Sequence, residues 1–101
     1  MNVAVELKVW NFQVLMLVQA MLGAVTPNFR MVVLSREGDV WVIRFYLERS
    51  LEDDADEIED IICQYTAYQD SDLKCKSEIW VGNEDLPRIS EADRVVYRRK
   101  E

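Results

Sequence analysis

The segment from Ser50 to Gln69 (SLEDDADEIEDIICQYTAYQ) constrains the fold more than any other stretch of this chain. Seven of the nine residues from Glu52 to Asp60 are acidic. Apolar residues recur between and beyond them at steps of 4, 3, 4 and 3, namely Leu51, Ala55, Ile58, Ile62 and Tyr65. This spacing predicts an α-helix with one apolar face for a core and one face of carboxylates. Ser50 is the predicted N-cap, and acids in the first turn suit the positive end of the helix dipole.

A broad apolar stripe predicts an earlier helix from about Val3 to Leu22, with Gly23 as a left-handed C-terminal cap. Because the stripe is broad, this helix either packs only in the core or also forms half of a dimer contact. Glu6 and Lys8 interrupt the run, and neither a positively charged start nor a small-residue cleavage site stands out. We therefore expect neither a membrane span nor a signal peptide.

Four stretches rich in β-branched and apolar residues predict strands, at Phe29–Ser35, Val40–Glu48, Leu73–Val81 and Arg94–Arg99. Turn signals precede or separate them, at Thr26-Pro27-Asn28, Arg36-Glu37-Gly38-Asp39 and Asp70-Ser71-Asp72. The first two strands are predicted to form a β-hairpin. The whole pattern, α-β-β-α-β-β, predicts an α+β fold with a four-stranded antiparallel sheet and helices packed on it. A length of 101 residues fits a single domain, residues 1–101.

The chemistry-bearing residues exclude several classes of enzyme. The chain contains no histidine and no glycine-rich phosphate loop, so it lacks the parts of Ser-His or Cys-His catalysis and of nucleotide binding. Cys63 and Cys75 have no C-x-x-C spacing, and we expect two reduced, mostly buried thiols, as is usual in the cytoplasm. No spacing typical of a calcium or zinc site occurs. We expect a protein without catalytic activity, metal or cofactor.

The charge distribution indicates the kind of partner. The formal net charge is −7, and the segment from Glu48 to Asp72, with ten acids and one base, carries −9. Such a patch attracts basic proteins and repels nucleic acids. The basic residues from Arg94 to Lys100 are expected to pair with the acidic helix or to protect a strand edge. The predicted contacts for a basic partner are the acids and aromatic anchors Glu52, Asp53, Asp56, Glu57, Asp60, Tyr68, Tyr46 and Trp80.

Three segments carry a resemblance to a known family, namely QAMLGAVTPNFRMVVLS (Gln19–Ser35), DDADEIEDI (Asp53–Ile61) and RVVYRRKE (Arg94–Glu101). Together they resemble small acidic bacterial immunity proteins, which are similar to those encoded beside toxins of the contact-dependent inhibition and colicin type. The resemblance implies a cytoplasmic protein that binds and neutralises a cognate toxin, often a basic nuclease. The alternative is a structural or homodimeric module in which the first helix or a sheet edge associates and the acids keep the protein soluble.

Overall fold

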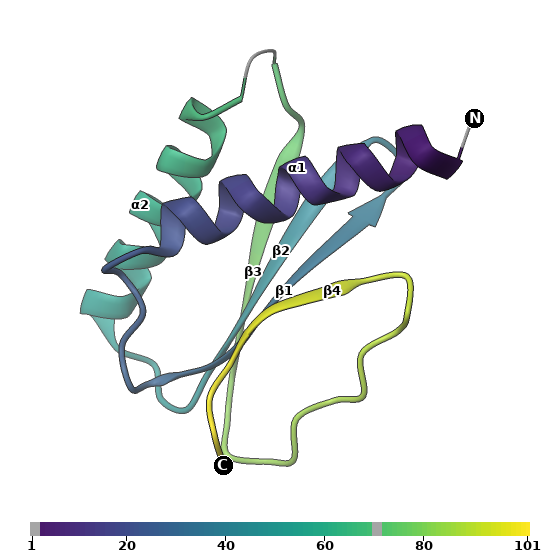
Figure 1. Ribbon diagram of the computed structural model, residues 1–101. Helices are drawn as coiled ribbons and strands as arrows, with labels where there is room; N and C mark the ends of the chain where they lie inside the picture. Colours follow the sequence, from purple (N-terminus) through teal and green to yellow (C-terminus); the bar gives the residue numbers. More distant parts are fainter. Residues whose placement is uncertain (1–2, 70–71) are drawn as a thin grey trace.

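The computed structural model describes residues 3–69 and 72–101 (Figure 1). The elements are α1 (Val3–Met21), β1 (Phe29–Glu37), β2 (Val40–Leu47), α2 (Glu52–Ala67), β3 (Cys75–Val81) and β4 (Arg94–Arg98). The predicted α+β class and the order α-β-β-α-β-β are confirmed. The predicted break at Asp70 and Ser71 lies outside the described residues.

The glycine and proline residues that predicted turns in the sequence are found at turns in the structure. Gly23 follows α1 with φ 79°, a conformation that glycine adopts without steric cost. At the next turn the Phe29 N–H donates to the Thr26 carbonyl oxygen at 3.0 Å, with Pro27 at the second position. The predicted hairpin is present, and Gly38 with φ 63° begins a two-residue connection between β1 and β2.

The sheet has the order β3-β2-β1-β4 and is mixed. β1 pairs antiparallel with both β2 and β4, whereas β2 pairs parallel with β3. The prediction of a fully antiparallel sheet is therefore wrong at one pair. The reason is the connection between β2 and β3, because α2 runs back along the sheet and returns the chain to the end where β2 began. A helical crossover of this kind places the next strand parallel to the previous one.

The core lies between the two helices and one face of the sheet. Figure 1 shows α1 crossing the sheet diagonally, and α2 packs on the same face because residues of both helices join one cluster. The buried members of this cluster are Leu17, Ala20, Met21, Phe29, Val32, Leu34, Trp41, Ile43, Phe45, Leu47, Ile58, Ile61 and Tyr65. Every second residue of β2 from Trp41 to Leu47 faces the helices, because successive side chains of a strand point to opposite faces of the sheet.

In the part of the chain that the structure describes, no helix covers the opposite face of the sheet, which we call the outer face. The long connection between β3 and β4 lies against it, since the Ser35 hydroxyl donates to Asp93 Oδ1 at 2.7 Å. Arg44 of β2 also lies on this face and pairs with Glu78 of the neighbouring strand at 2.9 Å. The fold therefore offers two different surfaces, a helical one and an outer one.

Candidate functional site

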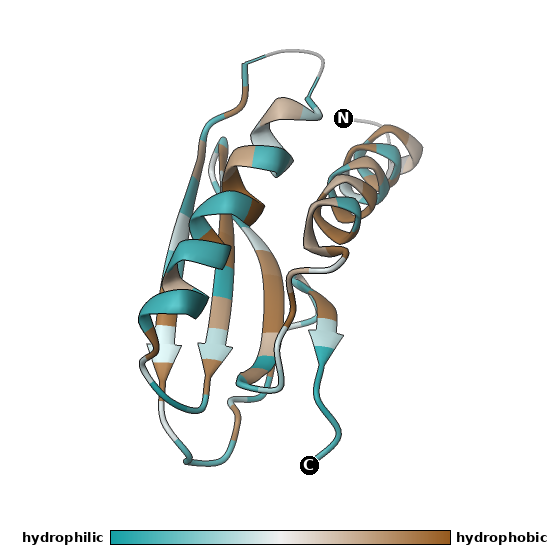
Figure 2. Ribbon diagram, turned by 90° about the vertical axis from the view of Figure 1, so that its left-hand side faces the viewer, coloured by the Kyte–Doolittle hydropathy of each residue, from teal (hydrophilic) through white to brown (hydrophobic). Residues whose placement is uncertain are grey.

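The exposed acids of α2 form the first candidate surface, which we call the α2 acidic face (Glu52, Asp53, Asp56, Glu57, Glu59 and Asp60). All of these side chains are exposed except Glu57, which is half-buried. Figure 2 shows the N-terminal turns of α2 as mostly hydrophilic and α1 as largely hydrophobic. The helix begins one residue later than predicted, with Leu51 as the N-cap and without a side-chain cap hydrogen bond, so Ser50 does not cap it.

The carboxylates of the α2 acidic face have no cationic partner within the part of the chain that the structure describes. The ion pairs found there involve other acids, namely Glu6, Glu37, Asp39, Glu48, Glu78, Asp93 and Glu101. The predicted pairing of the C-terminal bases with this helix is wrong among the described residues. Arg99 pairs instead with Glu48 at 3.0 Å, and the Arg94 guanidinium lies 4.8 Å from the centre of the Trp10 ring. The negative charge of the helix is thus left for other molecules.

Asp54 differs from its neighbours on α2, because it is only 3% exposed. Its carboxylate accepts hydrogen bonds from Thr26 Oγ1 at 3.0 Å and from Asn28 Nδ2 at 2.8 Å. The helical face that was predicted to be apolar therefore includes this aspartate, whereas Leu51 is 40% exposed. Asp54 joins α2 to the turn before β1 by these hydrogen bonds. Its role is therefore to hold the fold together, and we do not count it in the α2 acidic face.

The predicted aromatic anchors are not gathered beside the α2 acidic face. Tyr68 is 42% exposed at the C-terminal end of α2. Tyr46 and Trp80 are paired neighbours on β2 and β3 and lie on the outer face of the sheet. Their rings stack with centroids 6.4 Å apart and planes 17° from parallel. The residues predicted from the sequence thus divide between two surfaces on opposite sides of the sheet.

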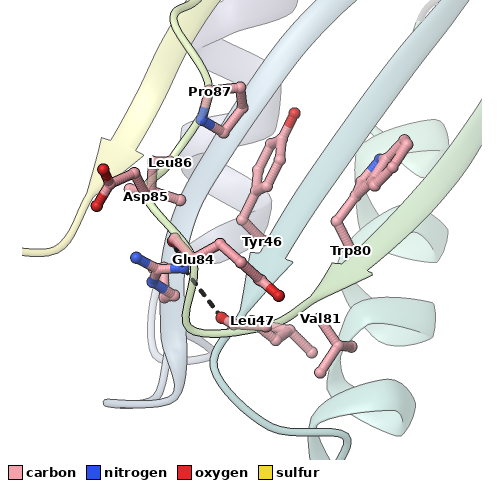
Figure 3. A pocket seen from close by; sticks show the side chains of 10 residues that line it. Tyr46, Leu47, Trp80, Val81, Glu84, Asp85, Leu86 and Pro87 are labelled. Atoms are coloured by element: carbon pink, nitrogen blue, oxygen red, sulfur yellow. Dashed lines mark hydrogen bonds between the residues drawn. The ribbon is translucent and has the colours of Figure 1, made fainter.

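Tyr46 and Trp80 form part of the wall of a pocket, which we call the outer pocket (Figure 3). Its volume is about 310 Å³. It is lined by Arg30, Tyr46, Leu47, Trp80, Val81, Gly82, Glu84, Asp85, Leu86 and Pro87. The polar segment 82–87 has no sequence pattern that predicted its contribution to a pocket. The apolar pair Leu86-Pro87 within that polar segment was the available signal.

Arg30 holds the pocket loop in place from the bulge in β1. It is 7% exposed, and its Nη1 donates to the carbonyl oxygens of Gly82 at 2.9 Å and Glu84 at 2.8 Å. Its Nε and Nη2 donate to the two carboxylate oxygens of Glu101 at 2.8 and 2.7 Å. Hydrogen bonds from Arg30 and then from Arg99 lower the pKa of Glu101 to about 2. One guanidinium therefore joins β1, the loop and the last residue of the chain.

Arg44 is the centre of a network of ion pairs on the rest of the outer face. Its Nε donates to Glu78 Oε1 at 2.9 Å, and Glu37 and Asp93 lie within 4.0 Å of its nitrogens. Hydrogen bonding from Arg44 is the main cause that lowers the pKa of Glu78. Beside this network, burial raises the pKa of Tyr46, so its phenol is neutral near pH 7.

The two cysteines are free, but the structure corrects their predicted burial. Cys63 is exposed on α2, and Cys75 is half-buried at the start of β3, where burial raises its pKa. The apolar neighbour Ile62 suggested a buried position for Cys63, but the helix turns that position away from the sheet. Among the described residues no group of three or more Cys, Asp or Glu side chains is placed to hold a metal ion.

The outward side of α1 is apolar as well. Leu7 and Leu15 are 52% and 62% exposed, Leu22 just after the helix is 69% exposed, and Val5, Phe12 and Val18 lie on the same side of the helix. In the described part of the chain, no helix combines the length and apolar character needed to cross a membrane. This exposed apolar surface agrees with the breadth of the stripe in the sequence.

The α+β fold, the unpaired acidic helix and the aromatic pocket describe a protein with several surfaces for contacts to other proteins. Comparison with known families shows its class, which is that of immunity proteins. The model of the MafI2 immunity protein family matches residues 13–101, and the chain belongs to this family. A search among curated proteins found no match. Family membership indicates a role in toxin immunity and confirms the resemblance to an immunity protein seen in the sequence; it does not distinguish a contact-dependent or colicin type.

Proposed function

We propose that this protein binds a cognate toxin through the α2 acidic face and neutralises it by occupying the toxin's basic surface, without catalysis. The unpaired carboxylates of α2 are the observation that carries the proposal. Like charges on successive turns repel one another, and lysines or arginines of a partner would relieve that repulsion. A concentrated negative patch also raises the rate of encounter with a basic protein.

A nuclease is the class of toxin that this surface fits best. Nucleases bind phosphate groups through lysine and arginine side chains, and an acidic helix presents negative charge to the same side chains. The protein itself has a net charge of −7 and would be repelled by nucleic acid. The free thiols of Cys63 and Cys75 support action in the cytoplasm, where thiols stay reduced.

A pull-down against the product of the neighbouring coding region tests this proposal. The bait variant carries Asp53→Lys, Asp56→Lys and Asp60→Lys, three exposed positions of α2. Wild type is expected to recover a basic protein, and the variant is expected to lose it. Glu57 is left unchanged because it is half-buried and its replacement could disturb folding.

A second triple variant separates the α2 acidic face from overall charge. Asp39→Lys, Asp72→Lys and Glu91→Lys alter exposed acids outside α2 and change the net charge by the same amount. This control is expected to keep the partner. Equal binding by both variants, or equal loss in both, would contradict a role for the α2 acidic face.

A homodimeric module is the second candidate function, and the exposed leucines of α1 favour it. A two-fold contact brings identical surfaces together, so a nearly uncharged apolar helix suits it and an acidic helix does not. Sedimentation of wild type and Leu15→Glu tests this candidate. A dimer that becomes a monomer in Leu15→Glu, and that is unaffected by the α2 triple variant, supports the homodimeric module. A wild-type protein that stays monomeric at high concentration excludes it.

A further inference from the structure

The outer pocket has the size and lining of a site for one long side chain. Its volume of about 310 Å³ is at the lower end of the range for ligand pockets. Leu86 and Pro87 supply apolar surface for the carbon stem of such a side chain. Figure 3 shows the loop residues on one side and the two aromatic rings on the other.

An aromatic face is open in this pocket. Trp80 is 55% exposed although it is paired in the sheet, because β3 is an edge strand. Tyr46 lies between Trp80 and the loop, stacks on Trp80 with one face and turns its other face toward the pocket (Figure 3). The faces of phenol and indole rings attract cations, and arginine is the side chain most often found there.

The charge available to an occupant of the pocket is negative. Figure 3 shows the Glu84 carboxylate extending toward the side of Tyr46 and Trp80, whereas the Asp85 carboxylate points away. Within the described residues Glu84 forms no ion pair, and only its backbone carbonyl oxygen is bound by Arg30. The charge of Arg30 is already compensated by its ion pair with Glu101, and its Nε and both Nη atoms donate four hydrogen bonds to oxygens of this chain.

We propose that the outer pocket binds an arginine side chain of a protein partner. The guanidinium stacks on the face of Tyr46 that is turned toward the loop, with Trp80 behind that ring, and donates hydrogen bonds to Glu84, while its carbon stem lies against the apolar lining. Guanidinium groups stack on aromatic rings and pair with carboxylates in a fixed planar geometry, which a lysine cannot reproduce. The proposal rests on the proposed function only in taking the partner to be a protein with exposed arginines.

The outer pocket and the α2 acidic face lie on opposite sides of the sheet, so they make separate contacts. A partner that uses both would have to pass around the edge formed by β3. Two contacts joined in one partner raise overall affinity through a high effective concentration of the second.

Titration of the isotope-labelled full chain with acetyl-Gly-Arg-Gly-amide, followed by NMR, tests this inference. The indole N–H resonance of Trp80 and the amide resonances of residues 82–87 are expected to shift. The same peptide with citrulline, which has nearly the same shape and no charge, is expected to bind about tenfold more weakly. Equal binding of the citrulline or the lysine peptide would overturn the inference, as would shifts confined to α2.

Two matched variants locate the interaction within the pocket. Glu84→Gln removes the inward carboxylate and is expected to weaken the arginine peptide about tenfold, because a charge-assisted pair is lost. Asp85→Asn removes the neighbouring charge that points away and is expected to leave binding unchanged. Equal effects of the two variants would overturn the inference. The titration uses no toxin, so its failure leaves the proposal for the α2 acidic face standing, and failure of the pull-down leaves the titration result unaffected.

Discussion

At the scale of single residues, the acids of this protein divide into those that hold the fold and those that face solvent. Asp54 and Asp53 are adjacent on α2, yet Asp54 is 3% exposed and bound to Thr26 and Asn28, while Asp53 is exposed. A carboxylate that is buried with hydrogen bonds cannot be removed without leaving its donors unpaired. One residue of the acidic segment is therefore an anchor of the core.

Asp54→Ala is expected to lower the free energy of unfolding by about 2 kcal/mol, since charge-assisted hydrogen bonds are lost and Thr26 Oγ1 is left without this acceptor. Asp53→Ala is the matched control and is expected to change stability by less than about 0.5 kcal/mol. Urea denaturation of both variants measures the difference. Similar midpoints for the two variants would show that the buried hydrogen bonds do not stabilise the fold.

The contact between Arg30 and Glu101 predicts a dependence of stability on pH. The pKa of Glu101 is lowered from 4.5 to about 2 in the folded protein. Its stabilising effect is therefore complete above pH 4.5 and is lost as the pH falls toward 2. The stability of wild type is expected to exceed that of Glu101→Gln near neutral pH and to approach it in acid. A constant difference between the two proteins, measured by urea denaturation across this range, would contradict the prediction.

At the scale of elements, α1 contributes to the core and also presents an apolar surface. Leu17 and Ala20 are buried, and Trp10 contacts Trp41 edge-on with ring centroids 4.9 Å apart. A variant that lacks residues 1–20 is expected to aggregate and to lose cooperative unfolding, because the sheet would expose this core. Size-exclusion chromatography and thermal unfolding measure both effects. A monodisperse, cooperatively folding variant would show that the helix is dispensable.

Leu15→Ala is the matched control for the removal of α1. Leu15 is 62% exposed, so this truncation takes little surface out of a packed environment. The variant is expected to unfold within about 0.5 kcal/mol of wild type. A large loss of stability in a monomeric protein would indicate that the outward side of α1 packs against something in the folded chain.

At the scale of the whole molecule, the concentration of negative charge on α2 predicts how a complex would respond to salt. Exposed charges are screened over about 10 Å at 0.1 M salt, so attraction at a distance weakens as salt rises. The association rate constant for the basic partner is expected to fall roughly tenfold or more between about 0.05 and 0.5 M NaCl, with a smaller change in the dissociation rate constant. Stopped-flow measurement with wild type and the α2 triple variant tests this. A salt-independent association rate for wild type would argue against steering by the α2 acidic face.

The sequence by itself determined the elements and their order, because each rests on local physics. The spacing of apolar residues, Gly23 after α1, the turn at Pro27 and the hairpin at Gly38 all act within a few neighbouring residues. The acidic helix was evident for the same reason. Family membership agrees with the resemblance that these segments carried.

Only the tertiary structure decided how the elements meet and which side chains share a surface. The parallel pairing of β2 with β3, the burial of Asp54, and the outer pocket depend on contacts between residues far apart in the chain. Arg30 and Glu101, for example, are 71 residues apart and form two hydrogen bonds. The stretch 82–87 has no periodicity of its own, and its shape comes from the guanidinium that binds its carbonyl oxygens. Local patterns carry no information about such contacts, because they form only when the chain folds back on itself.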